Sequence, residues 1–88
     1  MFEWGETKRL RVLAERGLDV RDAEIMFDGR PIVHARSARN GEERFVSTAE
    51  VAGRLLTIVW MWRNANQRII TFRRVHDGEE RAYRQVYG

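Results

Sequence analysis

The stretch Leu55-Leu56-Thr57-Ile58-Val59-Trp60-Met61-Trp62 is apolar at both odd and even positions, as a strand covered on both faces would be. Eight residues are too few for a membrane-spanning helix, which needs about 20. Asn64-Ala65-Asn66 follows as a hairpin turn, and Arg68–Arg73 is typical of a further strand. These residues predict a central strand and its hairpin partner.

Two shorter strands are expected before the central one. Ile32–Arg36 and Glu43–Ser47 are separated by a polar loop, Ser37–Gly41, that ends in Asn-Gly. Ala52-Gly53 then marks the turn into the central strand. Turns this closely spaced favour an antiparallel meander of four strands.

The first third of the chain predicts two helices. Glu6–Arg16 places three apolar residues on one face, and Gly17 follows where a left-handed C-terminal cap is expected. Asp19 is suited to cap a second helix, which ends at the turn Asp28–Pro31. The predicted buried residues are Leu10, Leu13 and Ala14 on the first helix and Val20, Ala23 and Phe27 on the second.

A third helix is expected at the C-terminus. Asp77 and Glu80 have the spacing of a capping box, and Ala82, Tyr83, Val86 and Tyr87 form an apolar stripe. The fold class is therefore α+β in one domain, residues 1–88: two N-terminal helices, a four-stranded antiparallel sheet and a C-terminal helix.

Composition excludes several classes of protein. A chain of 88 residues with 43% hydrophobic residues has a core and room for one small domain. It has no Cys, which excludes disulfides, thiolate metal sites and a Cys nucleophile. The N-terminus lacks the order of a secretion signal, so a cytoplasmic protein without a membrane segment is expected.

Charge is unevenly distributed along the chain. Residues 1–28 carry seven acids and five bases, a net charge of −2, whereas residues 29–88 carry six acids and eleven bases, a net charge of +5. Fifteen of the sixteen basic residues are Arg, whose guanidinium group suits phosphate and carboxylate. This balance indicates nucleic acid or an acidic protein as partner, or an Arg-rich surface without a specific role.

Several kinds of catalytic site lack their motifs. A glycine-rich phosphate loop is absent, and neither Ser37 nor Ser47 lies in a nucleophile elbow. His34 and His76, the two histidines, lie in different elements without the further ligands of a zinc site. The acid pairs Glu42-Glu43 and Glu79-Glu80 are typical of a solvated surface. Neither a metal nor a cofactor is therefore expected.

Basic and aromatic residues together give the strongest functional signal. Arg groups beside stacking aromatic rings are typical of sites for single-stranded RNA, although Trp60 and Trp62 also suit a core and Arg at strand ends also aids solubility. On an unbroken strand Arg68 and Arg74 share one face and Arg73 takes the other, so all three converge only at a bulge or strand end near Phe72. The groups concerned are Arg44, Arg68, Arg73, Arg74, Trp60, Trp62, Phe72 and Tyr83.

Three segments in register resemble the BrnT-type toxin family. The first is Phe2-Glu3-Trp4 with Lys8 and Gly17, and the second is Glu42-Glu43-Arg44-Phe45. The third is Arg68–Arg74, followed by Glu79 and Tyr83. The chain departs from the family pattern at Gly5, usually acidic, and at Val12, Glu15 and Arg16, where Asn and Lys-His are usual.

The resemblance implies a small ribonuclease toxin of a bacterial type II toxin–antitoxin system, with a RelE-like fold. Such toxins block translation by cutting RNA without a metal, with the ribose 2′-hydroxyl as nucleophile. The resemblance also implies a cognate antitoxin, a DNA-binding protein expected to be of the ribbon-helix-helix class, through which alone the toxin contacts DNA.

The expected catalytic groups are Arg44, Arg68 and Arg73, which would stabilise the charge of a phosphorane. Lys8, His76, Tyr83 and Glu43 are candidates for the general base and acid. Arg74 and Trp62 are expected to bind RNA, with Trp62 or Tyr83 stacking on a base. Two alternatives remain open: a module that binds RNA or antitoxin without cutting, and a structural partner whose Arg residues pair with an antitoxin.

Overall fold

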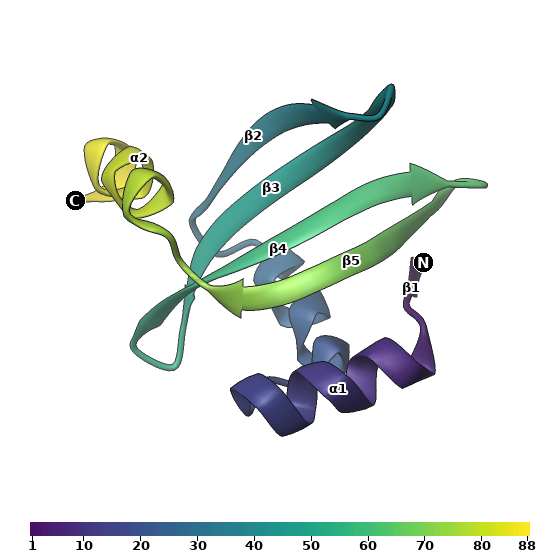
Figure 1. The fold of residues 1–88 in the computed structure, drawn as a ribbon. Helices are drawn as coiled ribbons and strands as arrows, with labels where there is room; N and C mark the ends of the chain where they lie inside the picture. Colours follow the sequence, from purple (N-terminus) through teal and green to yellow (C-terminus); the bar gives the residue numbers. More distant parts are fainter.

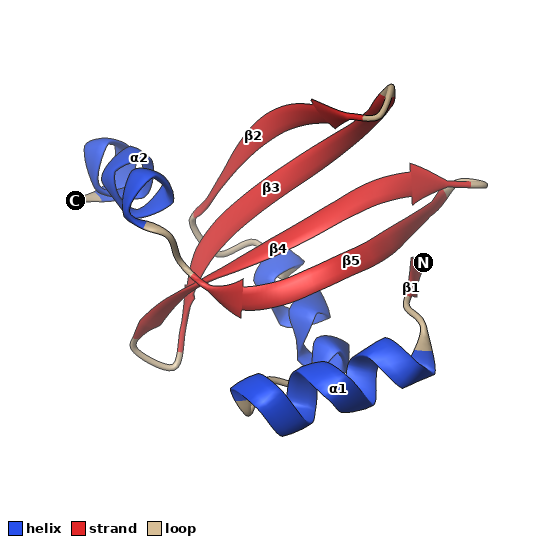
Figure 2. Ribbon diagram, in the orientation of Figure 1, coloured by secondary structure: helices blue, strands red, loops and turns tan.

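A sheet of five strands forms the centre of the computed structural model, and its helices lie on both sides of that sheet (Figures 1 and 2). The structure describes residues 1–88, apart from the side chain of Arg39. In chain order the elements are β1 (Phe2–Glu3), α1 (Glu6–Arg16), the 3-10 helix η1 (Val20–Phe27), β2 (Ile32–Arg39), β3 (Glu42–Val51), β4 (Arg54–Arg63), β5 (Asn66–Arg74) and α2 (Asp77–Tyr87).

The sheet is mixed, so the predicted four-stranded antiparallel sheet is wrong. Its order is β1-β5-β4-β3-β2, and β1 pairs in parallel with β5, with Glu3 opposite Arg68. The Gln67 N–H also donates to the Met1 carbonyl at 2.8 Å. A strand of two residues has no alternating pattern to recognise, which is why the sequence did not predict it. The other four strands form the expected antiparallel meander, and the fold class stays α+β.

The second N-terminal element is a 3-10 helix, so the prediction of two N-terminal helices is also wrong. Its buried residues are Val20, Ala23 and Met26, spaced three apart as a helix of three residues per turn requires. The predicted stripe ended at Phe27, which is half-buried. Asp19 does cap the helix, since its carboxylate accepts the Arg21 N–H at 3.0 Å.

Helix α1 has the predicted bounds but turns a different side to the core. Val12 is buried, whereas Leu10 and Leu13 are exposed. The Arg9 guanidinium donates to Asp19 at 3.0 Å, and this contact between α1 and the start of η1 helps to fix the rotation of the helix. Gly17 takes the expected left-handed conformation, with φ of 67°, and its N–H donates to the Leu13 carbonyl.

Two-residue turns join the four antiparallel strands. Asn40-Gly41, Ala52-Gly53 and Asn64-Ala65 all have positive φ at both positions, the geometry of a tight hairpin turn that matches strand twist. The strands are therefore longer than predicted. In particular, the expected polar loop Ser37–Gly41 is mostly strand, because β2 continues to Arg39.

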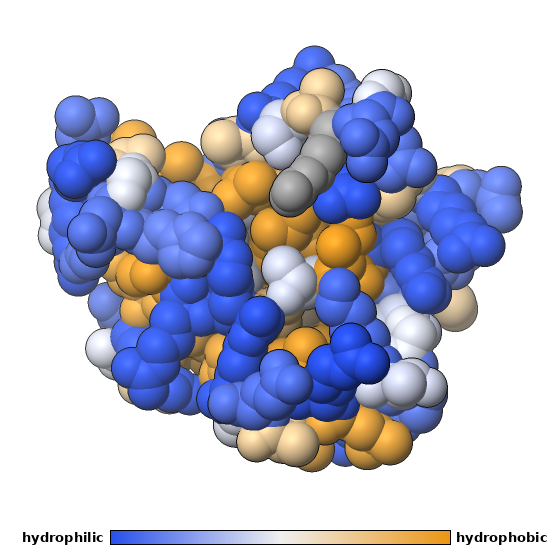
Figure 3. Space-filling model, viewed as in Figure 1, coloured by the Kyte–Doolittle hydropathy of each residue, from blue (hydrophilic) through white to orange (hydrophobic). Residues whose placement is uncertain are grey.

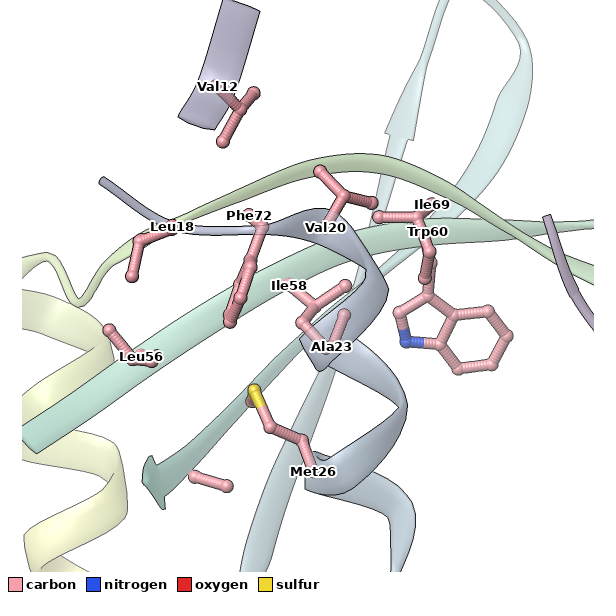
Figure 4. Packing of buried hydrophobic residues seen from close by; sticks show 11 residues of the cluster. Val12, Leu18, Val20, Ala23, Met26, Leu56, Ile58, Trp60, Ile69 and Phe72 are labelled. Carbon is pink, nitrogen blue, oxygen red and sulfur yellow. The ribbon is translucent and has the colours of Figure 1, made fainter. Parts of the chain in front are cut away.

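The core lies between the sheet and the two N-terminal helices (Figure 4). Phe72, Met26, Leu56 and Ile58 are among its largest fully buried side chains. On β4 the core residues Leu56, Ile58 and Trp60 alternate with Thr57, Val59 and Met61, which lie on the other face. We call the face that carries Leu56, Ile58 and Trp60 the helix-side face, because the two N-terminal helices cover it. The opposite face is the open face.

Helix α2 packs at one end of the open face. Its anchor is Tyr83, which is 6% exposed and contacts Tyr87 at a ring separation of 5.2 Å. The helix begins one residue earlier than predicted, because Glu79, not Glu80, accepts the backbone N–H of the cap residue His76. Among the described residues, no helix is long and apolar enough to cross a membrane.

Candidate active site

The part of the open face that α2 leaves uncovered forms the floor of the candidate site. In Figure 3 hydrophobic side chains appear in the middle of the molecule, with hydrophilic side chains around them. Register across β2 to β5 places Ala35, Val46, Val59 and Thr71 in one row of this floor. An apolar floor with a polar rim is a typical setting for a binding site.

Arg44 and Arg68 lie in one row across the open face. Arg68 is opposite Met61, and Glu3 on β1 is opposite Arg68. Arg44 precedes Phe45, the partner of the core residue Trp60, so its side chain points to the open face beside Met61. Residues from β1, β3, β4 and β5, far apart in the sequence, thus meet in one row.

A bulge in β5 brings Arg73 to the same face. Val59 is opposite Thr71 and Trp60 is opposite Ile69, which leaves Ile70 as an extra residue. Arg73 is opposite Thr57, four residues from Met61 on β4, so Arg68 and Arg73 share the open face. Arg74 is opposite Leu56 and lies on the helix-side face. The bulge therefore unites two of the three β5 arginines, and it lies two residues before Phe72.

Helix α1 adds cations at the edge of β5. Arg16 Nη1 donates to Thr71 Oγ1 at 2.8 Å and to the Phe72 carbonyl at 3.0 Å. Partial burial lowers the pKa of the Lys8 ammonium, and the nearby charges of Arg16, Arg11, Arg44 and Arg68 lower it further. Lys8 therefore lies within electrostatic reach of arginines from both α1 and the sheet.

Arg73 is held in place by Glu79 from α2. Arg73 Nη1 and Nη2 each donate to a carboxylate oxygen of Glu79 at 2.8 Å. Glu79 also accepts from Thr57 Oγ1 at 3.0 Å and from the His76 N–H at 2.9 Å. The hydrogen bonds from Arg73 are the main cause that lowers the Glu79 pKa to about 2. Glu79 thus neutralises the charge of Arg73 and fixes the position of its guanidinium group.

Arg44 and Arg68 have weaker partners. Arg44 Nη2 is 3.5 Å from Glu42, and Arg68 Nη1 is 4.0 Å from Glu3. Arg44 Nε is buried and has no hydrogen-bond acceptor within the described part of the chain. A buried donor without an acceptor is costly, and an anion beside Arg44 would satisfy Nε once the side chain turned toward it.

A cavity of about 460 Å³ lies where β5 ends. It is lined by Glu15, Arg16, Arg73, Arg74, Val75 and His76. Arg74, although on the other face of the sheet, thus joins Arg73 and the imidazole of His76 at the strand end. The cavity combines cations and an imidazole, groups that suit a phosphate.

Three of the predicted site residues lie elsewhere. Tyr83 is the buried residue of α2. Trp62 is 54% exposed and lies on the helix-side face, against Trp60. Glu43 lies beside Arg36, 3.5 Å away, near the β2–β3 turn. The open face therefore brings together Arg44, Arg68, Arg73 and Lys8. One end of it is bordered by His76 and Arg74. The remaining candidates, Trp62, Tyr83 and Glu43, lie away from this group.

Sequence reasoning missed two members of the site. Arg16 was expected only as a departure from the family pattern. Glu79 was expected as part of a surface acid pair and of the third family-like segment, without a role in the site. The capping position of Glu79, three residues after His76, was the available signal. No corresponding signal existed for Arg16, because its partners Thr71 and Phe72 lie 55 and 56 residues away.

The arrangement is chemically suited to polyanions. Fixed guanidinium groups stabilise negative charge, and a lysine of lowered pKa can exchange a proton near neutral pH more readily than an ordinary lysine. Among the residues that the structure describes, no three His, Cys, Asp or Glu side chains gather as metal ligands would.

Comparison with known proteins gives one informative result. No curated protein matches the chain significantly. The family model described as "Ribonuclease toxin, BrnT, of type II toxin-antitoxin system" matches residues 4–79. This match includes the segments at Lys8, Arg44 and Arg68–Arg74 and confirms the resemblance noted in the sequence. The chain therefore belongs to the BrnT family of ribonuclease toxins of type II toxin–antitoxin systems.

Proposed function

We propose that this toxin is a metal-independent endoribonuclease that cuts RNA on the open face of its sheet. The observation that carries the proposal is the row formed by Arg44 and Arg68, with Lys8 close enough for both to affect its pKa. Cleavage of RNA builds up negative charge on phosphorus and its oxygens, and preorganised cations stabilise that charge.

In the proposed reaction the ribose 2′-oxygen attacks the adjacent phosphorus. Lys8, as the neutral amine, takes the proton of the 2′-hydroxyl while the new O–P bond forms. The bond from phosphorus to the 5′-oxygen breaks, and the leaving oxygen receives a proton. His76, in the cavity at the end of β5, is the proposed donor of that proton. The products are a 2′,3′-cyclic phosphate and a 5′-hydroxyl.

The arginines have different roles in this proposal. Arg44 and Arg68 bind the scissile phosphate, because their ion pairs are long and Arg44 Nε lacks an acceptor among the described residues. Arg73 is held by its ion pair with Glu79 and thereby keeps the end of β5 in position beside the site. Arg74 and Arg16 hold a neighbouring phosphate at the end of β5.

The test is the chemistry of the products. Purified toxin is incubated with RNA in excess EDTA, and the fragments are analysed by mass spectrometry. The proposal predicts cutting in EDTA, 2′,3′-cyclic phosphate ends and resistance of a substrate that carries 2′-deoxyribose at the cleaved position. Cleavage that stops in EDTA, or equal cleavage of the deoxy substrate, would contradict it.

A second candidate, an RNA-binding module without nuclease activity, is favoured by the neutralised state of Arg73. In the same incubation this candidate predicts a gel shift without fragments.

We also infer a setting for this activity from the family. A type II toxin has a cognate antitoxin. We propose that this antitoxin is a ribbon-helix-helix DNA-binding protein, that the toxin contacts DNA only through it, and that RNA cleavage in the cytoplasm blocks translation. Co-expression with the product of the adjacent reading frame tests this: rescue of growth and of amino-acid incorporation is expected, and continued arrest would contradict the proposal.

A further inference from the structure

A second cavity lies on the helix-side face, at the β2 edge of the sheet. It has a volume of about 360 Å³ and is lined by His34, Ala35, Arg36, Phe45 and Trp60. Register pairs Arg36 with Phe45 and Phe45 with Trp60, which places these three in one row on the face opposite Arg44 and Arg68. Ala35 of the open-face floor also borders the cavity, but the aromatic and charged residues that line it lie on the face opposite the proposed cleavage site.

Planar groups form most of its walls. The rings of Phe45 and Trp60 stack with centroids 4.6 Å apart, and the Arg36 guanidinium lies 5.6 Å from the Phe45 centroid. On the other side, Phe27 stacks on the imidazole of His34 at 6.1 Å. Aromatic rings are surfaces on which unpaired RNA bases stack.

A chain of hydrogen bonds fixes the tautomer of His34. Trp60 Nε1–H, which can only donate, donates to Ser47 Oγ at 2.9 Å. Ser47 is fully buried, so its own hydroxyl proton needs an acceptor, and His34 Nδ1 lies 2.6 Å away. In the neutral imidazole Nδ1 therefore accepts, and the ring proton is on Nε2. His34 is left with an N–H donor that Ser47 does not use.

Arg36 supplies further donors beside it. Its ion pair with Glu43 is 3.5 Å long, and the two side chains are 75% and 59% exposed. An exposed pair of this length contributes little, so the guanidinium is free to bind a ligand. The side-chain polar groups that line this cavity, His34 Nε2–H and Arg36, are thus donors.

We propose that this cavity binds a guanine base of the RNA, at a nucleotide other than the one being cut. Guanine presents two adjacent acceptors, O6 and N7, on the edge that arginine recognises, whereas adenine presents one acceptor beside an amino donor. The assignment rests on the proposed function, since it takes RNA as the substrate. It makes the toxin prefer RNA with a guanine at a fixed distance from the cut.

The test is a titration of the purified full-length toxin with GMP and with AMP, followed by the NMR signal of the Trp60 indole N–H. Both nucleotides carry the same phosphate, so the difference isolates the base. GMP is expected to shift this signal with at least about fivefold higher affinity than AMP, and Arg36→Ala is expected to weaken GMP binding about tenfold.

The matched control is Arg84→Ala. Arg84 is also exposed, lies 5.9 Å from the Tyr83 ring centroid and pairs with Glu80 at 3.6 Å, but it is on α2. It should bind GMP as the wild type does. Equal affinity for GMP and AMP, an unchanged Trp60 signal, or unaffected binding by Arg36→Ala would overturn the assignment. So would a shift of this signal by the antitoxin but not by GMP.

The two proposals fail independently in this design. A variant with Arg44→Ala and Arg68→Ala keeps the guanine cavity, so it should bind GMP normally even though cleavage is lost. If the wild type binds GMP but never cuts RNA, the nuclease proposal alone is wrong. If it cuts RNA but does not bind GMP, the guanine site alone is wrong.

Discussion

Glu79 holds Arg73 through two hydrogen bonds of 2.8 Å, and this pair joins α2 to the last strand of the sheet. Thr57 donates to the same carboxylate, and Thr57 and Thr48 share a hydrogen bond of 3.0 Å beneath it. A polar network thus runs from the helix into the buried part of the sheet, at the border of the proposed cleavage site.

This network predicts that stability depends on Glu79 and on pH. The ordinary Glu pKa of 4.5 falls to about 2 in the folded protein. The ionised carboxylate therefore stabilises the fold at pH values above 4.5, and this contribution is lost as the pH falls toward 2. Glu79→Gln should lower the free energy of unfolding by about 1–3 kcal/mol at pH 7, with a smaller difference at pH 3.

Denaturant unfolding at the two pH values measures this effect. The control is Glu80→Gln, since Glu80 forms only a half-exposed pair with Arg84 at 3.6 Å. It should change stability by less than about 0.5 kcal/mol. Equal losses of unfolding free energy in the two variants would contradict a stabilising role for the pair of Arg73 and Glu79.

Gly5 offers a test of the contact between α1 and Arg68. It is the N-cap of α1 and makes no side-chain cap, and a Cβ there would lie 3.4 Å from Arg68 Nη2. Gly5→Asp supplies both a capping carboxylate and a partner for Arg68, so we expect a gain of about 0.5–1 kcal/mol in unfolding free energy. Gly5→Ala, which adds the contact without the carboxylate, should not be stabilising. A loss of stability in Gly5→Asp would mean that Arg68 cannot move to accommodate it.

Lys8 can be tested through the pH dependence of cleavage. If its neutral amine is the general base, the rate rises with pH until the lowered Lys8 pKa is passed. Lys8→Arg keeps the positive charge but does not deprotonate, so it should retain RNA binding while kcat falls about 100-fold. Its remaining activity should lack the rise with pH. An unchanged pH profile in Lys8→Arg would assign the base to another group.

Ser47 provides a structural test of the aromatic cavity. Ser47→Ala leaves both the Trp60 indole N–H and His34 Nδ1 without their partner, so it should cost about 1–3 kcal/mol of stability. Ser37→Ala, at an exposed serine on the same strand as His34, is the control and should stay within about 0.5 kcal/mol of wild type. Thermal or denaturant unfolding distinguishes them. Equal stability of the two variants would contradict the inferred hydrogen-bond chain.

Local signals were enough to predict much of the fold. Glu6–Arg16 and Gly17 have the sequence of a helix and its cap, and the doubly apolar Leu55–Trp62 is the middle strand of the sheet. The predictions that failed concern features that depend on contacts between residues distant in the sequence. The parallel pairing of Phe2 and Glu3 with β5 spans more than 60 residues. The rotation of α1 depends on Arg9 and Asp19, and therefore the apolar spacing of Leu10 and Leu13 was misleading.

The candidate site shows the same limit. Strand alternation alone separates Arg68 from Arg73, and only the extra residue Ile70 brings them to one face. The arginines could converge only at a bulge or strand end near Phe72, but no residue pattern in the sequence indicates that a bulge exists there. The pairing of Arg73 with Glu79 likewise depends on where α2 begins, which was predicted one residue too late.

The most direct test of the open face as the cleavage site is a comparison of two double variants. Arg44→Ala with Arg68→Ala removes both phosphate-binding groups, whereas Arg81→Ala with Arg84→Ala removes the same charge from the exposed side of α2. RNA cleavage rates are measured for both at equal protein concentration, after circular dichroism has confirmed folding. We expect the first to fall at least about 100-fold and the second to stay within about twofold of wild type. Equal rates in the two variants would contradict the assignment of cleavage to this face.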